Sequence, residues 1–350
     1  MSSMSSEPRI SVIILNRNGL QWLQRCFDSI ETQTLFSEIE VLFADNQSSD
    51  ASDVFAAQWL ARLPHGRLVQ TGGDTGYCAG NNSGAAVATG KYLFFLNNDA
   101  WLEPDCLEKL WDEVEAAGAD AASPLVLNYD DDTLQSIGGS GLDLFGLMSP
   151  IEPPARTVEI FAACGAAYFI RRAMFERVGG FDAALFMYGD ETDLSCRVQI
   201  AGGRIVAVPA ARVHPRGAGE ENPDRHAKPA QLRTSETKRY LANRNGLLFL
   251  LKNAEHALLL LLVPHLLLLM AEAVASLVLV RRWGYVRKAY LKAVTDCWRM
   301  RGHVAGWRDE IAGFRRRGDL EMLRFLRLRP NRWEEVRRVF QRGVPVIKQR

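Results

Sequence analysis

The chain has 350 residues, of which 47% are hydrophobic and 24% are charged, and its formal net charge is +1 at pH 7. These proportions are ordinary for a globular protein with a substantial core, and they exclude a largely disordered or fibrous chain. The six cysteines are far apart and no pair has the spacing of metal ligands, which favours reduced thiols in a cytosolic protein over a disulfide framework.

Charge is distributed unevenly along the chain. From residue 281 to the end there are 20 basic and 7 acidic residues, a net charge of about +13, so the remainder carries about −12. A basic tail behind an acidic body is typical of a protein with an anionic partner, such as membrane headgroups, nucleic acid or the body itself. Residues 1–8 are polar, and we expect them to be a disordered terminus without a secretory signal.

The first part of the chain alternates apolar runs with segments of helical periodicity. We expect strands at residues 9–15, 39–44, 67–70, 91–96 and 119–127. Helices are expected between them, at residues 19–31, 51–61, 78–89 and 104–116. This alternation predicts right-handed βαβ units and therefore an α/β fold with a mostly parallel sheet flanked by helices.

The alternation breaks at residues 129–154, where Asp, Gly and Pro predict a loop-rich insertion. Beyond it we expect strands at 161–170 and 204–208 and helices at 171–178, 193–201 and 238–252. The predicted domains are a disordered N-terminus (1–8), an α/β domain (9–252, with halves 9–127 and 128–252) and an apolar, basic helical region (253–350).

Residues 257–280 form an apolar run long enough to span ~30 Å of hydrocarbon as a helix. Because Pro264 and Glu272 interrupt the run, three interpretations stay open: an interfacial or re-entrant helix, a membrane span, and a buried or dimer-forming helix. Tryptophans among the arginines of the tail suit anchoring at headgroup level. We therefore expect residues 255–350 to meet a membrane surface, whereas the sequence lacks a nucleic-acid motif and leaves open whether the protein is a homo-oligomer.

Five polar segments occur in a fixed order: 12–16, 45–50, 76–82, 96–100 and 190–194. Most follow or open an apolar run, so their acids and amides are expected to collect where strands end, beside one another in the sheet. Such a cluster suits a metal, a nucleotide diphosphate and a hydroxyl group that must lose a proton. Taken singly, the segments are weaker signals, because residues 45–50 also fit an Asx turn and residues 190–193 also fit acids at a helix N-terminus.

In this order, the segments resemble the family 2 inverting glycosyltransferases with the GT-A fold, notably bacterial rhamnosyltransferase-like members that build surface polysaccharides. The resemblance covers residues 9–252 and rests on Leu15-Asn16-Arg17, the Asp-Asn-Gln-Ser-Ser-Asp run at 45–50, the glycine motif at 74–82, Leu-Asn-Asn-Asp at 96–99, and Gly-Gly-Phe-Asp at 179–182 followed by the acids at 190–193 and by Arg197.

The resemblance implies a role for each group of residues. The catalytic base is Glu191, with Asp190 as an alternative base or an acceptor ligand. A divalent cation, Mg²⁺ or Mn²⁺, is bound by Asp99 and His214. The donor-binding residues are Asn16, Asp45, Asn46, Ser48, Asp50, Asp74, Gly76, Asn82, Asn97 and Asn98. The acceptor-binding residues are Gly165, Ala166 and Asp190, which places the donor in residues 9–127 and the acceptor in 128–252.

Three positions depart from the family pattern. Asp74 stands where the glycine motif usually begins with Asn, Asp99 has no partner Asp two residues earlier, and the acid pair reads Asp190-Glu191 in place of Glu-Asp. The predicted function is inverting transfer of a sugar from a nucleotide-diphosphate donor to a hydroxyl group of a glycan or polyprenyl-linked acceptor. It would take place at the cytoplasmic membrane face, with the protein peripheral or monotopic.

Two alternatives remain from other classes of protein. A nucleotide-sugar nucleotidyltransferase requires a glycine-rich basic loop near the N-terminus, and Arg17-Asn18-Gly19 is a weak candidate for one. A non-catalytic glycan-binding or scaffold protein would not need the acids and the histidine. The spacing of a dinucleotide-binding glycine motif is absent.

Overall fold

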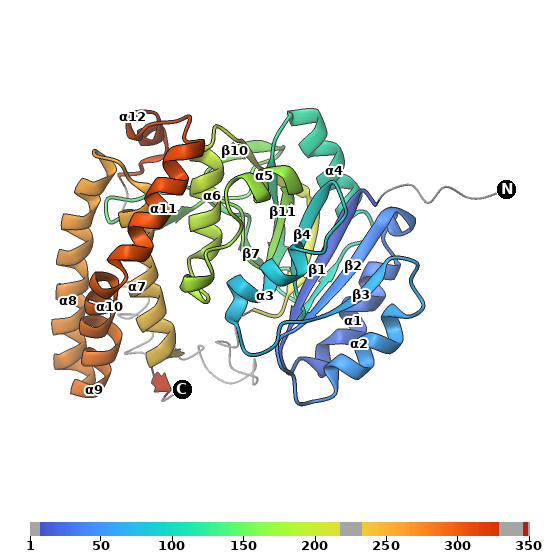
Figure 1. Ribbon diagram of the computed structural model, residues 1–350, viewed down its shortest axis with the longest axis horizontal. Helices are drawn as coiled ribbons and strands as arrows, with labels where there is room; N and C mark the ends of the chain where they lie inside the picture. The colour runs from blue at the N-terminus through green and yellow to red at the C-terminus, as the bar shows by residue number, and fades with distance from the viewer. Residues whose placement is uncertain (1–7, 218–232, 329–345, 349–350) are drawn as a thin grey trace. The chain divides into compact units, whose positions relative to one another are not determined.

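The computed structural model describes residues 8–217, 233–328 and 346–348 (Figure 1). Of the predicted disordered terminus, 1–8, residues 1–7 lie outside the described residues. The chain forms two compact units. The first comprises residues 1–139, 150–199 and 203–216, and the second comprises 140–149, 200–202 and 217–350.

A mixed sheet of ten strands organises the first unit. Its order is β10-β12-β6-β11-β4-β1-β2-β3, and β5 and β7 add to β12 and β6. The strands are β1 (Ile10–Asn16), β2 (Ile39–Asp45), β3 (Gly66–Gln70), β4 (Tyr92–Asn97), β5 (Ala100–Leu102), β6 (Ala121–Leu127), β7 (Leu134–Ser136), β10 (Val158–Ile160), β11 (Ala167–Arg171) and β12 (Ile205–Pro215).

The sheet changes direction at β11. Strands β3, β2, β1 and β4 are parallel neighbours, as the alternation of strands and helices predicts. Strand β11 lies antiparallel between β4 and β6, because the chain returns through the loop-rich insertion in place of a helical crossover. The predicted α/β class is confirmed, and the sheet as a whole is mixed.

Helices cover both faces of this sheet. They are α1 (Leu20–Glu31), α2 (Ser52–Leu60), α3 (Gly76–Ala85), α4 (Cys106–Ala117), α5 (Arg172–Arg177) and α6 (Asp190–Ile200), with 3₁₀ turns η1 (Phe36–Glu38) and η2 (Ala183–Leu185). On one face, Phe27 of α1 stacks on Trp59 of α2 with ring centroids 4.1 Å apart. On the opposite face, α3 lies so close to β1 that a Cβ atom at Gly80 would overlap Leu15.

Strand β12 is longer than the sequence predicts. The expected strand at 204–208 continues to Pro215, because a register shift between Val208 and Arg212 lets the chain go on to pair with β5. His214 therefore lies inside a strand, whereas the sequence placed it after one. The expected strand at 161–170 is shorter, since only its end forms β11.

The second unit is mainly helical. Its elements are α7 (Glu236–Asn253), η3 (Leu258–Leu261), α8 (Leu262–Val280), α9 (Trp283–Val286), the π-helix η4 (Arg287–Leu291), α10 (Lys292–Arg299), α11 (Arg301–Phe314), α12 (Asp319–Met322) and η5 (Leu323–Phe325), with the short strands β8 (Gly139–Leu142), β9 (Met148–Pro150), β13 (Arg233–Ser235) and β14 (Val346–Lys348). Helix α7 belongs to this unit, although the sequence placed residues 238–252 in the first domain.

The apolar run predicted at 257–280 forms η3 and α8. Pro264 is the third residue of α8, next to the change from the 3₁₀ turn η3 to the α-helix, and it lies near a helix start, where proline is tolerated best. Among the described residues, Leu258–Val280 is the one helical stretch long and apolar enough to cross a membrane, judged by length and composition alone. The six cysteines are free thiols.

Candidate active site

The carboxyl ends of β1, β2 and β4 bring polar side chains together at one edge of the sheet. Asn16 is in register with Asp45, and Leu15 is in register with Asn97. The Asn16 side chain accepts a hydrogen bond from the Asn98 amide and donates one to the Ser48 hydroxyl at 3.0 Å. These contacts join residues far apart in sequence into one polar cluster, which is where parallel strands place the residues that follow them.

Asp45 and Asp50 hold the loop after β2 in different ways. One Asp45 carboxylate oxygen accepts the Ser48 N–H at 3.1 Å, whereas the other, Oδ1, is buried without a hydrogen-bond partner in the part of the chain that the structure describes. Asp50 accepts the backbone N–H groups of Leu20 at 2.9 Å and Ser52 at 3.1 Å, so it caps the first residues of both α1 and α2. Asp45 is therefore the acid with an open acceptor atom.

Asp74 lies in the loop before α3 and forms an ion pair with Arg17. It also accepts a hydrogen bond from the Asn46 amide at 3.3 Å, and Asn46 Oδ1 accepts the Thr75 N–H at 2.9 Å. Arg17 belongs to the Leu15-Asn16-Arg17 element and to a weak candidate for a basic loop, but the sequence does not predict its pairing with Asp74. The signal that could have revealed it is the replacement of the usual Asn by Asp at position 74, which gives a basic neighbour a partner.

Asn82 and Gly76 both contact the segment from Phe181 to Phe186 in the free protein. The Asn82 amide donates to the Phe181 carbonyl at 2.7 Å and accepts the Phe181 N–H at 3.0 Å, which fastens α3 to the turn before η2. Gly76 has φ +75°, and a Cβ atom there would overlap the Phe186 ring. Only glycine fits this close approach without strain.

Asp99 follows β4 and is largely buried. Its Oδ1 atom is a second buried acceptor without a hydrogen-bond partner among the described residues. Burial raises the pKa of the Asp99 carboxyl, and the nearby positive charge of Arg216 opposes that shift. A buried carboxylate oxygen with no donor is costly unless a proton or a cation neutralises it.

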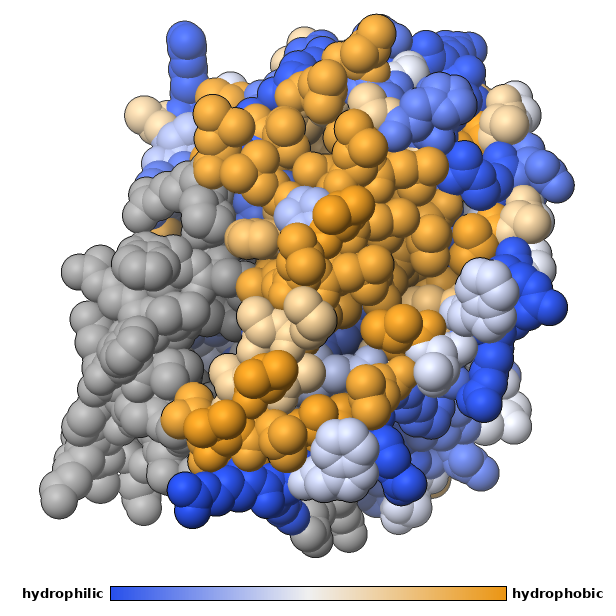
Figure 2. Space-filling model, turned by 90° about the vertical axis from the view of Figure 1, so that its left-hand side faces the viewer, coloured by the Kyte–Doolittle hydropathy of each residue, from blue (hydrophilic) through white to orange (hydrophobic). Residues whose placement is uncertain are grey.

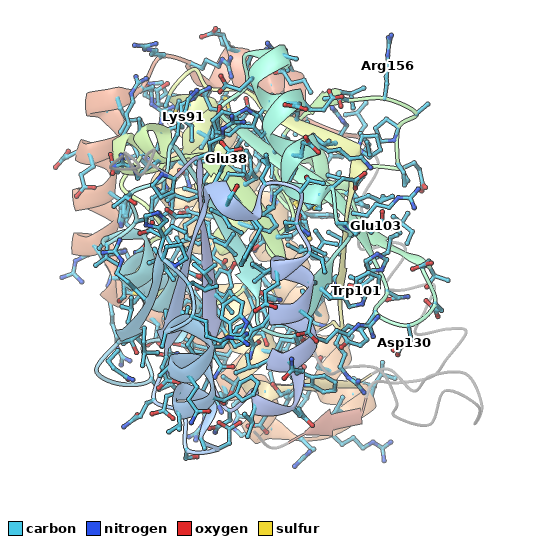
Figure 3. The ribbon with its side chains drawn as sticks, turned by 90° about the vertical axis from the view of Figure 1, so that its right-hand side faces the viewer. Glu38, Lys91, Trp101, Glu103, Asp130 and Arg156 are labelled. Atoms are coloured by element: carbon cyan, nitrogen blue, oxygen red, sulfur yellow. The ribbon has the colours of Figure 1, made fainter. Side chains whose placement is uncertain are left out.

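His214 lies on β12, opposite Trp101 of β5. The two rings stack, with centroids 3.7 Å apart and planes 2° from parallel. His214 Nε2 is 3.6 Å from Glu103 Oε1 and Nδ1 is 3.3 Å from Asp132 Oδ1, while Nε2 is buried without a hydrogen-bond partner in the described parts of the chain. Figure 3 labels Trp101 and Glu103 on this side of the unit. Among the described residues, no group of three or more His, Cys, Asp or Glu side chains is arranged to hold a metal ion.

The segment at Gly165 and Ala166 connects the end of β4 with the acids of α6. Ala166 accepts the Asn97 N–H at 3.1 Å. A Cβ atom at Gly165 would lie 3.4 Å from Glu191 Cβ and 3.5 Å from Glu191 Oε2, so Gly165 adjoins that side chain. The Tyr77 hydroxyl donates to the Gly165 carbonyl at 2.8 Å. Residues predicted for donor, acceptor and catalysis therefore adjoin one another here.

The two acids at the start of α6 differ in environment. Asp190 is 5% exposed, whereas Glu191 is half-buried. Burial raises the pKa of Asp190 well above its ordinary value, and the charge of Glu191 raises it further. Burial also raises the pKa of Glu191. Ionisation of one acid opposes ionisation of the other, and Glu191 is the more accessible of the two.

The side chain of Arg197 binds the backbone beside the Gly-Gly-Phe-Asp element at 179–182. This side chain is fully buried, forms an ion pair with Asp193 at 3.0 Å and donates to the carbonyl oxygens of Val178 and Gly180. The acidic helix α6 is thereby fastened to the turn that precedes it. Asp193 therefore supports the start of α6, which carries Asp190 and Glu191.

Comparison with known proteins identifies the family of the domain in the first part of the chain. Residues 11–179 match the family described as Glycosyl transferase family 2, so the chain carries a glycosyl transferase family 2 domain. A solved structure described as GalNAc-T7 with UDP, GalNAc and Mn²⁺ covers 60% of this chain and 44% of its own, with a TM-score of 0.52 and 20% identity. At that identity the likeness concerns the fold, and it agrees with the GT-A fold expected from the sequence.

Two curated relatives are similar in sequence. The O-antigen biosynthesis protein RfbC of Myxococcus xanthus is 29% identical over 59% of this chain and 17% of its own length. The N-acetylglucosaminyl-diphospho-decaprenol L-rhamnosyltransferase of Mycobacterium tuberculosis is 29% identical over 50% of this chain and 66% of its own length. The resemblance to bacterial rhamnosyltransferase-like members of the family is thus confirmed, although the matches span less than two thirds of each relative.

Proposed function

We propose that the protein is an inverting glycosyltransferase, which moves a hexosyl or deoxyhexosyl group from a nucleotide-diphosphate donor to a hydroxyl group of a glycan acceptor by a single displacement. The observation that carries this proposal is the junction at Gly165 and Ala166. On one side it holds the end of β4 through Asn97, and on the other it touches Glu191. Donor and proton acceptor can then face each other across one reacting carbon.

Glu191 is the general base in this proposal. It takes the proton of the acceptor hydroxyl as the oxygen attacks the anomeric carbon, and the bond from that carbon to the nucleoside diphosphate breaks. Asp190, buried and protonated, donates a hydrogen bond to the acceptor or to Glu191. Gly165 and Ala166 are assigned to the acceptor sugar because Gly165 adjoins Glu191.

The donor is assigned to the polar cluster at the strand ends. Asp45 and Asn46 contact the base and ribose, with Ser48 and Asp50 keeping their loop in place. Asn97, Asn98 and Asn16 lie beside the ribose and diphosphate. Asp74, Gly76 and Asn82 act through the loop before α3, which they fix in position through Arg17, Phe186 and Phe181.

A divalent cation, Mg²⁺ or Mn²⁺, is assigned in this proposal to Asp99, which follows β4, and to His214 on β12. Asp99 Oδ1 and His214 Nε2 are buried atoms without hydrogen-bond partners in the described residues, and carboxylate oxygen and imidazole nitrogen are both suitable ligands. Asp99 and His214 would hold the ion, with phosphate oxygens and water completing its shell. When bound, the ion offsets the negative charge that develops on the departing diphosphate.

The acceptor in this proposal is a glycan, lipid-linked through a polyprenyl chain, because the rhamnosyltransferase relative is named for such an acceptor. The protein would then work in surface polysaccharide synthesis at the cytoplasmic face of the membrane, as a peripheral or monotopic protein. The apolar helix α8 and the basic residues after it support a membrane surface as the partner of residues 255–350.

Product analysis tests this function. The full chain is incubated with Mn²⁺, a lipid-linked glycan extract and, in turn, UDP-glucose, UDP-GlcNAc, dTDP-rhamnose and GDP-mannose. One donor is expected to release nucleoside diphosphate and to give a product of inverted anomeric configuration by NMR. Formation of nucleoside triphosphate from nucleotide-sugar and pyrophosphate would instead identify a nucleotidyltransferase, and no turnover with any donor would favour a scaffold.

A further inference from the structure

Helix α8 presents an apolar face to solvent along its whole length. Val263, Met270 and Val278 are 60%, 61% and 63% exposed, and they lie seven to eight residues apart, which places them on one side of the helix. Figure 2 shows the apolar side chains of this face as one continuous patch. Monomeric soluble proteins rarely leave an apolar patch of this kind exposed, so we expect a partner to cover it.

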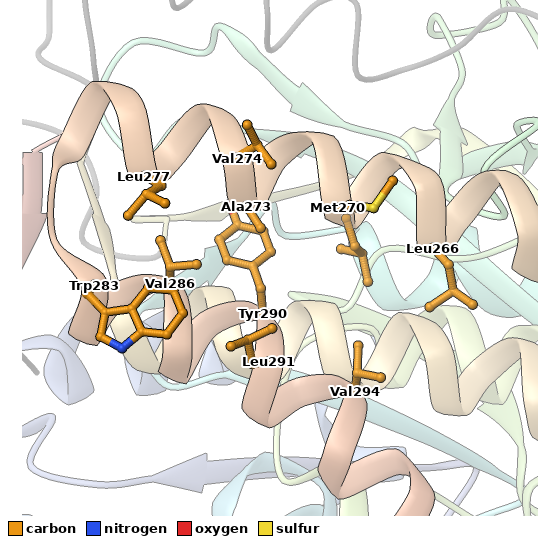
Figure 4. Close-up of a pocket in the computed structure, with 11 residues that line it drawn as sticks. Leu266, Met270, Ala273, Val274, Leu277, Trp283, Val286, Tyr290, Leu291 and Val294 are labelled. Atoms are coloured by element: carbon orange, nitrogen blue, oxygen red, sulfur yellow. The ribbon is translucent and has the colours of Figure 1, made fainter.

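A groove opens beside this face, within the second unit. Leu266, Met270 and Leu277 of α8 form one wall, and Trp283, Tyr290 and Val294 belong to the opposite wall, formed by α9, η4 and α10 (Figure 4). Its volume is about 320 Å³. Apart from the Tyr290 hydroxyl and the Trp283 N–H, the side chains named here offer no hydrogen-bonding group, so the groove suits hydrocarbon better than water.

The opposite face of α8 is polar and packs within the unit. Glu272 pairs with Arg239 of α7 at 3.8 Å, and Ser276 hydrogen-bonds the Tyr290 hydroxyl at 3.2 Å. On α10, Asp296 pairs with Lys292. If α8 crossed a bilayer, these neighbouring charges would enter the hydrocarbon with it, which is strongly unfavourable. The fold therefore allows lipid on one side of α8 only.

The residues that border the groove carry positive charge. Between Arg281 and Arg301 there are seven basic residues and one acid, Asp296. Trp283 and Trp298 among them are 57% and 73% exposed. Exposed tryptophan beside arginine and lysine is the composition of protein segments at the headgroup level of an anionic membrane.

We propose that α8 lies in the plane of an anionic phospholipid monolayer, with its outer face among the acyl chains and the groove between α8 and α10 occupied by them. The protein is then monotopic, and the basic segment 281–301 contacts the phosphate headgroups. This inference rests on the membrane partner proposed above, and it adds the orientation of the helix, the residues in contact with lipid and the charge of the lipid. A bilayer is preferred over a single bound lipid chain because the exposed face extends past the groove, to Leu260 and Val278.

Nitroxide depth measurements test the orientation. Single cysteines replace Val263, Met270 or Val278 in the full chain, in a Cys164→Ser background, because the other five native cysteines are buried. The labelled sites span ~22 Å along the helix axis. With vesicles of phosphatidylglycerol and phosphatidylcholine, oxygen and nickel-complex accessibilities are expected to report the same shallow depth at the three sites. A label at Val54, 53% exposed on α2, should remain in water.

Vesicle sedimentation tests the surface itself. Binding to vesicles containing phosphatidylglycerol should be at least tenfold tighter than to phosphatidylcholine alone. Met270→Glu should weaken it at least tenfold, and Val54→Glu should change it less than twofold. A label depth that passes through the bilayer centre along α8, a dimer that shields the labels without lipid, or full binding by Met270→Glu would each overturn the proposal. None of these measurements depends on turnover, so the glycosyltransferase proposal stands or fails separately.

Discussion

Replacing Glu191 by Gln removes the proposed base while preserving the shape of the side chain. The contact with the Gly165 backbone persists because Gln has the same length, and the pKa of Asp190 is still raised by burial. A positioned general base contributes about 10²- to 10⁴-fold to rate, which corresponds to roughly 3–5 kcal/mol of transition-state stabilisation. We therefore expect kcat to fall by that factor, with donor affinity changed less than about twofold.

The assay is release of nucleoside diphosphate at saturating donor, with donor affinity measured separately by calorimetry. Glu176→Gln is the matched control, since Glu176 lies exposed on α5 in an ion pair with Arg172 and should leave both quantities unaltered. Wild-type turnover by Glu191→Gln with unchanged donor affinity would show that Glu191 is not the base. A loss of donor affinity as large as the loss of kcat would mean that it binds the donor instead.

Three further substitutions follow from the same contacts. Asp190→Asn removes a carboxyl group whose pKa is higher in the folded than in the unfolded state, so ionisation penalises folding as pH rises above the ordinary Asp pKa of about 3.9. The variant should gain roughly 2–4 °C in Tm at pH 7 and nothing at pH 3.5. An equal gain at both pH values would contradict this reasoning. Tyr77→Phe removes the hydroxyl group that donates to the Gly165 carbonyl, and it should lower the free energy of unfolding in urea by about 1 kcal/mol. It should also raise the KM for the acceptor more than it lowers kcat. An unaltered KM would argue against a role for this contact. Arg197→Met leaves the Asp193 charge buried without its partner and should cost about 3–5 kcal/mol, whereas a cost below 1 kcal/mol would show that the pair contributes little.

The first half of the sheet could be predicted because its strands and helices follow strict periodicities. Strands β1, β2 and β4 lie within one or two residues of the expected ranges, and parallel pairing then places Asn16, Asp45 and Asn97 at one edge. The antiparallel insertion of β11 between β4 and β6 could not be predicted, because short runs of apolar residues carry no information on strand direction.

Several site contacts depend on hydrogen bonds between residues far apart in sequence. Asn82 bonds Phe181 across 99 positions, and Arg17 meets Asp74 across 57. No local pattern marks the contact of Asn82 with Phe181, whereas the Asp at position 74 is the one sequence signal for a basic partner such as Arg17. Similarly, the bulge after Val208 carries β12 on to His214 and sets that ring against Trp101, whereas a strand ending at 208 would have left the histidine in a loop.

Thermal denaturation of the full chain with UDP, dTDP, GDP or ADP, each with and without Mn²⁺, tests the metal-assisted donor site. We expect one nucleotide to stabilise the protein only when Mn²⁺ is present, by about 2.7 kcal/mol at a hundredfold excess over Kd. Asp99→Asn should abolish that dependence on metal. If no nucleotide stabilises the protein, or if stabilisation is the same without metal and in Asp99→Asn, the polar cluster at the ends of β1, β2 and β4 is not a metal-assisted donor site.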